Sequence, residues 1–128
     1  MSLEQIHTDQ APAAIGPYSQ AIKCGDFLYV SGQIPLVPST MELTERTIDV
    51  QTNQVFDNLE AILKEAGTDL SKAVKVEVFL DDMNDFQAVN EIYAQRFTTE
   101  PKPARQAVEV SRLPKDVMVE ISLIAYLG

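Results

Sequence analysis

The chain has 128 residues, of which 45% are hydrophobic and 23% charged, which predicts one domain over residues 1–128 with one modest core. Its formal net charge of −9 argues against binding to nucleic acid or to an anionic membrane. A single Cys excludes an intrachain disulfide framework and a multi-thiolate metal site. Because no signal peptide or membrane-spanning run is apparent, we expect a cytoplasmic protein.

The first half of the chain predicts two strands followed by a helix. Residues 17–35, PYSQAIKCGDFLYVSGQIP, place β-branched and aromatic residues on both sides of a turn at 24–26. Residues 36–43 are expected to form a loop. Apolar residues at helical spacing then predict a helix from about residue 47 to 66, with Gly67 as its stop.

The second half predicts a strand, a helix and two further strands. In AVKVEVFL, residues 73–80, Val74, Val76, Val78 and Leu80 alternate with Lys75 and Glu77, which is typical of a strand with one wetter side. A helix is predicted from residue 84 to about 97, with Phe86, Val89, Tyr93 and Phe97 facing inward. The segments ARQAVEV and VMVEISLIAYL, residues 104–110 and 117–127, complete the series.

The order β-β-α-β-α-β-β predicts an α+β fold with a mixed sheet. Right-handed crossovers that step in the same direction would place both helices on one face of that sheet. The last strand is almost continuously apolar, which suggests burial on both sides. We therefore expect a homo-oligomer in which a second copy covers the open face.

Two charged residues within the last strands are the sharpest candidates for chemistry. Arg105 should project from the same face as Ala107 and Glu109, and its planar guanidinium could bind a carboxylate through two hydrogen bonds. Glu120 lies in the most apolar strand and could hold or activate a water molecule. Composition is equally consistent with an Arg on an edge strand that faces solvent or pairs with an acid. It is also consistent with a Glu in a structural ion pair with an Arg, within the chain or across a subunit interface.

Other residues are compatible with a site without requiring one. Gly32, after Ser31 at the end of a strand, allows either close approach of a ligand or a simple bulge. Tyr18 could cover a small substrate or pack in the core, and Asn90 lies among polar neighbours on the second predicted helix. The sequence contains no Gly-rich phosphate loop, zinc-ligand spacing or Ser-His-Asp set, so neither a metal nor a cofactor is expected.

Four motifs, read in order, carry a family resemblance. The segments APAAIGPYSQAI, SGQIP, DDMNDFQAVNEIY and PARQAVEVSRLPKDVMVEI resemble the RidA family, also called YjgF or L-PSP, from about residue 7 to 126. The resemblance implies a homotrimer with a chorismate mutase-like fold, in which the final strand lies between the first long strand and the strand after the first helix. It also implies hydrolysis of 2-aminoacrylate and 2-aminocrotonate to 2-oxo acids and ammonia.

Transferred to this chain, the resemblance implies that Arg105 binds the substrate carboxylate and Glu120 positions the hydrolytic water. Tyr18, Ser31, Gly32, Asn90 and Ala107 would then line a cleft between subunits. The family usually has Arg-Ser-Cys where this chain has Arg105-Gln106-Ala107, so any chemistry of that thiol is lost.

Two other functions are left open at this stage. One is a non-catalytic protein that binds 2-oxo acids or related metabolites through Arg105. The other is an endoribonuclease, a description applied to some relatives, which the net charge of −9 and the single His disfavour.

Overall fold

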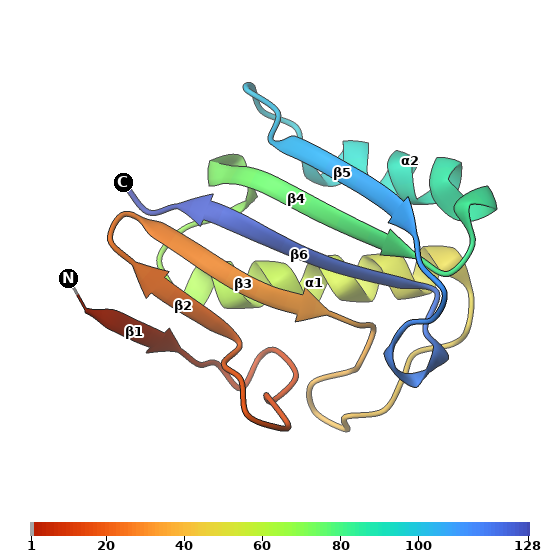
Figure 1. Ribbon diagram of the computed structural model, residues 1–128, viewed down its shortest axis with the longest axis horizontal. Coiled ribbons are helices and arrows are strands. Elements are labelled where there is room, and N and C mark those ends of the chain that lie inside the picture. Colours follow the sequence, from red (N-terminus) through yellow and green to blue (C-terminus); the bar gives the residue numbers. More distant parts are fainter. Residues whose placement is uncertain (1) are drawn as a thin grey trace.

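The computed structural model describes residues 2–128, which form one mixed six-stranded sheet and two α-helices (Figure 1). In chain order the main elements are β1 (Leu3–Ile6), β2 (Ala21–Cys24), β3 (Phe27–Gln33), α1 (Ile48–Glu65), β4 (Ala73–Leu80), α2 (Phe86–Arg96), β5 (Ala104–Glu109) and β6 (Val119–Tyr126). Short 3₁₀ turns lie at Leu70–Lys72, Met83–Asp85 and Pro114–Asp116. The predicted α+β class is confirmed, and the predicted elements occur in the predicted order after one additional strand near the start of the chain.

The sheet runs in the order β1-β2-β3-β6-β4-β5. The last strand, β6, is therefore inserted between β3 and β4 and is antiparallel to both, as Figure 1 shows. The predicted position of the final strand is confirmed. The parallel pair is β4 with β5, which leaves β5 on one edge of the sheet and β1 on the other.

One strand was not predicted. The segment Leu3–Ile6 pairs antiparallel with β2, and only Ile6 in it is buried. Four residues that are mostly exposed carry neither the length nor the alternation by which a strand is recognised in a sequence. The strand exists because the edge of β2 offers unpaired backbone groups.

The predicted inward position of Val74 is wrong. Its side chain is 43% exposed, whereas Ala73 beside it is buried. The pairing of β4 with β6 shifts register between Ala73 and Lys75, and this irregularity interrupts the two-residue alternation. Beyond it, Val76, Val78 and Leu80 are buried as expected.

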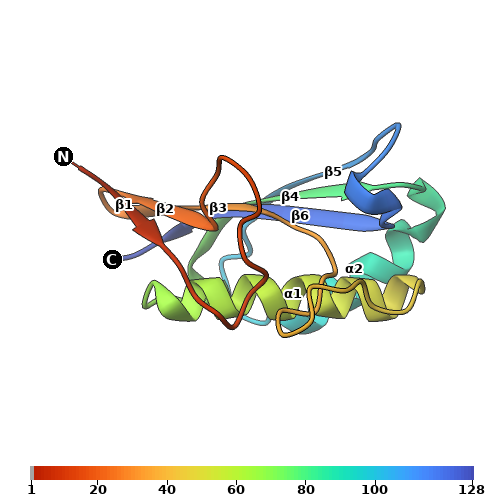
Figure 2. The ribbon, with the colours of Figure 1, turned by 90° about the horizontal axis from the view of Figure 1, so that it is seen from below.

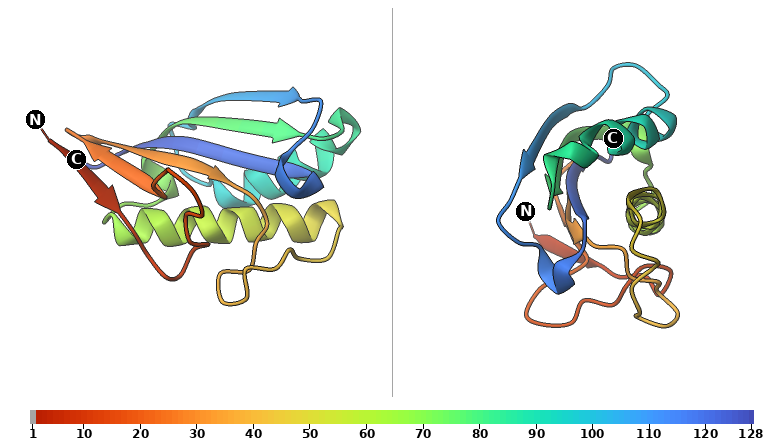
Figure 3. Two further views of the ribbon diagram at one scale, coloured as in Figure 1. Left: turned by 60° about the horizontal axis from the view of Figure 1, so that its bottom comes forward. Right: turned by 90° about the vertical axis from the view of Figure 1, so that its right-hand side faces the viewer.

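Both helices pack on one face of the sheet, as predicted, and leave the other face without a covering layer (Figures 2 and 3). In β6 the alternate residues that face the helices are buried, namely Val119, Ile121, Leu123 and Ala125. The residues between them are only partly buried or exposed, so the expected burial on both sides is absent in the single chain. The open face exposes large side chains that include Phe27, Tyr29 and Tyr126.

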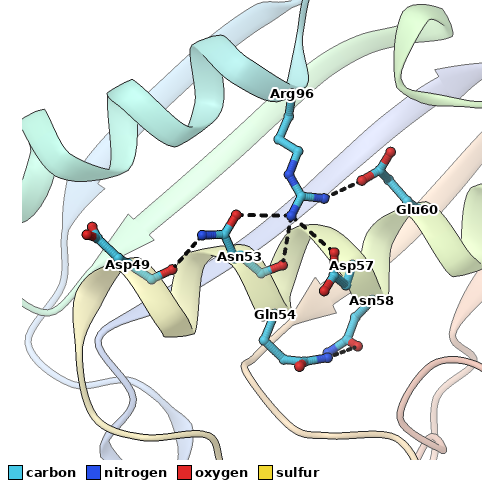
Figure 4. A network of polar contacts seen from close by, with 7 residues as sticks. All are labelled: Asp49, Asn53, Gln54, Asp57, Asn58, Glu60 and Arg96. Carbon is cyan, nitrogen blue, oxygen red and sulfur yellow. Dashed lines mark hydrogen bonds and ion pairs between the residues drawn. The ribbon is translucent and has the colours of Figure 1, made fainter.

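A polar network joins the two helices at the end of α2 (Figure 4). Arg96 donates to the backbone and side-chain oxygens of Asn53 at 3.3 and 3.0 Å and to Asp57 at 3.1 Å, and it also pairs with Glu60. Its guanidinium lies 5.6 Å from the centre of the Phe56 ring. The Arg96 side chain is only 21% exposed, whereas its acidic partners Asp57 and Glu60 are 61% and 47% exposed; together these contacts fix α2 against α1.

Arg96→Leu should therefore lower the free energy of unfolding by about 1–3 kcal/mol, because several charge-assisted hydrogen bonds are lost together. Denaturant titration measures the change. The matched control is Arg112→Leu, since Arg112 pairs with Asp116 in an exposed position and its loss should cost less than about 0.5 kcal/mol. Equal costs for the two substitutions would mean that the network adds nothing to the packing of the helices.

Candidate functional site

Glu120 lies in a cavity of about 400 Å³. Three parts of the chain that are distant in sequence form its walls: the loop after β1, the end of β3 with the loop that follows it, and the region from Pro114 to β6. The lining residues are Pro12, Ala13, Tyr18, Gln20, Ser31, Gly32, Gln33, Ile34, Leu36, Pro114 and Glu120. Four of the residues predicted from the sequence, Tyr18, Ser31, Gly32 and Glu120, are thus brought together.

Gly32 is needed for the close approach of Glu120. A Cβ atom at position 32 would overlap the Glu120 carboxylate, so any larger residue there would displace the carboxylate. Pairing of β3 with β6 also shifts register between Val30 and Gln33, which places Gly32 in an irregularity of the strand. The bulge interpretation of Gly32 is therefore confirmed, and the group that approaches it here is the Glu120 side chain of the same chain; close approach of a ligand stays a prediction.

The Glu120 carboxylate is half-buried and unpaired. Within residues 2–128 it makes no hydrogen bond or ion pair, so the structural ion pair considered above is absent from the single chain. Burial raises the pKa of Glu120 above the ordinary value of a glutamate. A carboxylate with a raised pKa and free oxygen atoms can accept a proton from a bound water molecule.

A buried amide, which the sequence interpretation missed, holds the wall of this cavity. Gln20 accepts a hydrogen bond from the backbone of Thr8 at 2.8 Å and donates to the carbonyl oxygens of Thr8 and Pro12 at 3.0 and 2.8 Å. It thereby fixes the segment that leads to Ala13. Only its position at the start of an apolar strand could have indicated burial, since Gln is usually exposed.

Ser31 and Tyr18 have distinct positions in the cavity. The Ser31 hydroxyl donates to the carbonyl oxygen of Ser19 at 2.6 Å, which ties the end of β3 to the loop that carries Tyr18. The Tyr18 side chain is 53% exposed, so the alternative of core packing is wrong for the single chain. Its ring forms part of the cavity wall and is available to a ligand or to a second subunit.

Arg105 lies elsewhere, on the edge strand β5, and is exposed rather than buried. Its guanidinium donates to the Asn90 side-chain oxygen at 2.6 Å. It also stacks over the rings of Tyr93 and Phe86, at 4.7 and 5.3 Å from their centres. Phe86 and Tyr93 were predicted as inward-facing core residues of α2. Their spacing of seven, which places them on one side of a helix with Asn90 between them, was the signal of a shared role.

The aromatic platform, defined as Phe86 and Tyr93, leaves the guanidinium free for an anion. Arg105 forms no ion pair within the described part of the chain, and one of its five N–H donors is used by Asn90. A neighbouring recess of about 370 Å³ is lined by Tyr93, Ala94, Phe97, Lys102, Pro103 and Arg105. Ala107, which follows on the same face of β5, is partly buried and packs against the core.

Arg105 and Glu120 lie on opposite faces of the sheet. Arg105 is in register with Val76 of β4, which is buried beneath the helices, whereas Glu120 is in register with Phe79. Residues three apart on a strand project to opposite faces. One chain therefore contains two separate half-sites, the carboxylate half-site around Glu120 and the guanidinium half-site around Arg105.

The basic residues at 102–115 do not form a common anion site. Lys102 pairs with Glu100 at 3.1 Å, and Arg112 pairs with Asp116 at 2.8 Å. Arg105 is the one of these that is held on a rigid platform without an acidic partner. No cluster of potential metal ligands occurs among residues 2–128, and none of the helices in this range is long and apolar enough to cross a membrane.

Glu120→Gln should leave the unfolding temperature at pH 7 equal to or above that of the unmodified protein. The folded-state pKa of Glu120 exceeds its unfolded value, so ionisation disfavours the folded state at any pH above the unfolded pKa. The gain should vanish below about pH 4, where the carboxyl group is neutral in both states. Unfolding temperatures of Glu120→Gln and of the exposed control Glu91→Gln, recorded from pH 7 down to about pH 4, measure this gain. A lower unfolding temperature at pH 7 would reveal a cation paired with Glu120 in the assembled protein.

Comparison with known proteins finds relatives over almost the whole chain. The family model described as Endoribonuclease L-PSP matches residues 8–127. A RutC family protein of Pyrococcus horikoshii is 58% identical over 123 residues, which are 96% of this chain and 97% of that protein. Reactive Intermediate Deaminase A of Arabidopsis thaliana is 44% identical over 97% of this chain and 66% of its own length.

Solved structures show the same fold. A Rid family protein of Yersinia pestis superposes with a TM-score of 0.96 at 49% identity, over 98% of this chain and 99% of that one. TdcF of Escherichia coli, solved with bound serine, gives a TM-score of 0.90 at 39% identity over 98% and 99% of the two chains. With the family model matched over residues 8–127, the chain belongs to the Rid family, which is the L-PSP family of that model.

Proposed function

We propose that this protein hydrolyses reactive enamine and imine intermediates, 2-aminoacrylate and 2-aminocrotonate among them, to 2-oxo acids and ammonia. The observation that supports this most directly is the pair of unpartnered groups. Within residues 2–128, Arg105 is an oriented guanidinium without an acidic partner, and Glu120 is a half-buried carboxylate without a hydrogen-bond donor. A small molecule with a carboxylate next to an electrophilic carbon would pair its carboxylate with Arg105. It would then present the electrophilic carbon to a water molecule held by Glu120.

The complete site forms, in this proposal, between two subunits of a homotrimer. Arg105 and Glu120 lie on opposite faces of one sheet, so a single chain cannot direct both at one small ligand. The open face of the sheet, with its exposed aromatic residues, is the surface that a neighbouring copy would cover. The guanidinium half-site of one subunit would then meet the carboxylate half-site of the next.

The steps balance with solvent as the proton source for the first of them. The enamine takes a proton from solvent at C3 and loses one from nitrogen, which gives the imine. Glu120 accepts a proton from water, whose oxygen forms a bond to C2 while the C=N electrons move to nitrogen, and Glu120 returns the proton to that nitrogen. Glu120 then carries the hydroxyl proton of the carbinolamine to the amino nitrogen, so that the C–N bond breaks, the C=O bond forms and neutral ammonia leaves. Arg105 holds the carboxylate throughout, and the Tyr18 ring limits access of bulk solvent.

The alternative of an endoribonuclease has little support in the structure. RNA binding needs several cations directed at phosphates. Here Lys102 and Arg112 are paired with acidic neighbours, and the chain carries a net charge of −9. A metabolite-binding protein without catalysis would use the same guanidinium half-site, so it differs from the proposed function in turnover rather than in ligand.

The direct test couples a serine or threonine dehydratase to detection of the 2-oxo acid, with and without this protein. We expect faster release than the spontaneous rate with at least one dehydratase. Arg105→Lys should lose roughly tenfold or more of that acceleration, because Lys cannot offer a planar pair of donors. Arg112→Lys, outside both half-sites, is the matched control and should be unaffected. Binding of 2-oxo acids without any acceleration would favour the non-catalytic alternative.

Subunit mixing tests where the complete site forms. Trimers assembled from equal amounts of Arg105→Lys and Glu120→Gln chains should regain about a quarter of the unmodified activity, because each mixed ring contains one interface with both residues intact. Either variant alone should stay near background. Co-refolding followed by the coupled assay measures the recovery. If mixed trimers form but stay inactive, Arg105 and Glu120 do not serve one site across a subunit boundary.

A further inference from the structure

A second cavity, of about 440 Å³, adjoins the carboxylate half-site. Its walls are Ala13, Ile15, Tyr18, Ile34, Leu36, Met41, Pro114 and Lys115. Five of these residues also line the cavity around Glu120, namely Ala13, Tyr18, Ile34, Leu36 and Pro114. The two cavities therefore share a wall, and a ligand held near Glu120 can extend from one into the other. We call the second cavity the apolar lobe.

The chemistry of the apolar lobe differs from that of the first cavity. Glu120, Ser31 and Gln20 contribute polar atoms to the first. The lobe replaces them with the aliphatic side chains of Ile15 and Met41, and its one charged residue, Lys115, is exposed. Ile15 is 73% exposed in the single chain, which leaves its apolar surface open to a ligand.

Met41 is the unexpected member of this set. Its backbone has a φ of 59°, in the left-handed region that Gly adopts without steric cost. The turn is closed by hydrogen bonds from the Met41 and Thr40 amides to the carbonyl oxygen of Val37, at 2.7 and 3.3 Å. Gly would satisfy the same turn. A long thioether side chain is thus present at a position where the backbone disfavours any side chain, and it lines the lobe.

We infer that the apolar lobe binds the side chain of the substrate and that Met41 and Ile15 set its preference. The inference rests on the proposed function, which places the reacting carbon beside Glu120. The lobe can accept a branched or aliphatic chain of several carbons, whereas a three-carbon imine would leave it vacant. A flexible thioether adapts to such chains. The protein should therefore favour 2-imino acids with leucine-like side chains over the three-carbon compound.

The test compares 2-imino acids generated in situ by amino-acid oxidases from alanine, leucine and glutamate. Appearance of 2-oxo acid above the spontaneous rate gives kcat/KM for each. We expect the leucine-derived imine to exceed the alanine-derived one by roughly tenfold. Met41→Gly should remove most of that preference, chiefly by lowering kcat/KM for the leucine-derived imine, and Ile15→Ala should act in the same direction. Met83→Ala, an exposed methionine outside the lobe, is the control.

A second measurement separates the lobe from catalysis. Calorimetry should show that 4-methyl-2-oxopentanoate binds more tightly than pyruvate and that Met41→Gly abolishes the difference. If hydrolysis of no imine is accelerated while this Met41-dependent binding is observed, the proposed function is wrong and the assignment of the lobe is retained.

The opposite results would overturn the lobe. If hydrolysis of the alanine-derived imine is accelerated but the leucine-derived imine is not preferred, the proposed function is supported and the lobe assignment is wrong. A preference for the glutamate-derived imine would show instead that the cavity binds an acidic side chain through Lys115. Dissociation of the oligomer by Met41→Gly, measured by light scattering, would show that the lobe is a contact between subunits.

Discussion

The insertion of β6 between β3 and β4 is the constraint on which the rest of the structure depends. Because β6 pairs with both strands, it forms the centre of the sheet and brings the start of the last strand beside the end of β3. The Glu120 carboxylate can then lie over Gly32, 88 residues earlier in the chain, without a side chain in its way. The same insertion makes β5 an edge strand, since β4 has β6 as its other neighbour. An exposed Arg105 follows from that edge position.

The two half-sites use different means to prepare a charged group. In the guanidinium half-site, aromatic faces and one hydrogen bond donated to Asn90 orient Arg105, and exposure to solvent keeps its charge hydrated. In the carboxylate half-site, partial burial raises the pKa of Glu120 and makes it a better proton acceptor. Apposition of the two would bring a cation near that carboxylate and lower its pKa again. Binding of the substrate carboxylate would neutralise the guanidinium and raise the pKa of Glu120 again, so that Glu120 is most basic when the substrate is bound.

Much of the fold was predictable because its signals are local. The helices follow from apolar spacing, and the stop at Gly67 agrees with its φ of 85°. The failures have a common cause in pairing between distant segments. Strand β1 depends on the free edge of β2, and the exposure of Val74 depends on a register shift against β6. For the site, residue types alone suggested Arg105 and Glu120, but the family resemblance was needed to join them. The opposite faces that they occupy, and the anchor at Gln20, required the three-dimensional pairing.

Several features that disfavour folding lie around one cavity. Among residues 2–128 Glu120 is a half-buried carboxylate without a partner, Met41 and Lys115 are non-glycine residues with positive φ, and Ile15 exposes an aliphatic side chain to solvent. Each would be easily relieved by substitution, and nothing in the packing of the core requires them. On the other side of the sheet the Arg96 guanidinium is paired and the aromatic rings are packed, and the Tyr93 hydroxyl is a buried polar atom of this core that has no hydrogen-bond partner within the described residues. The unfavourable features around this cavity extend from the Glu120 carboxylate into the apolar lobe. Such features are expected where the residues of a surface are selected for binding a ligand rather than for the stability of the fold.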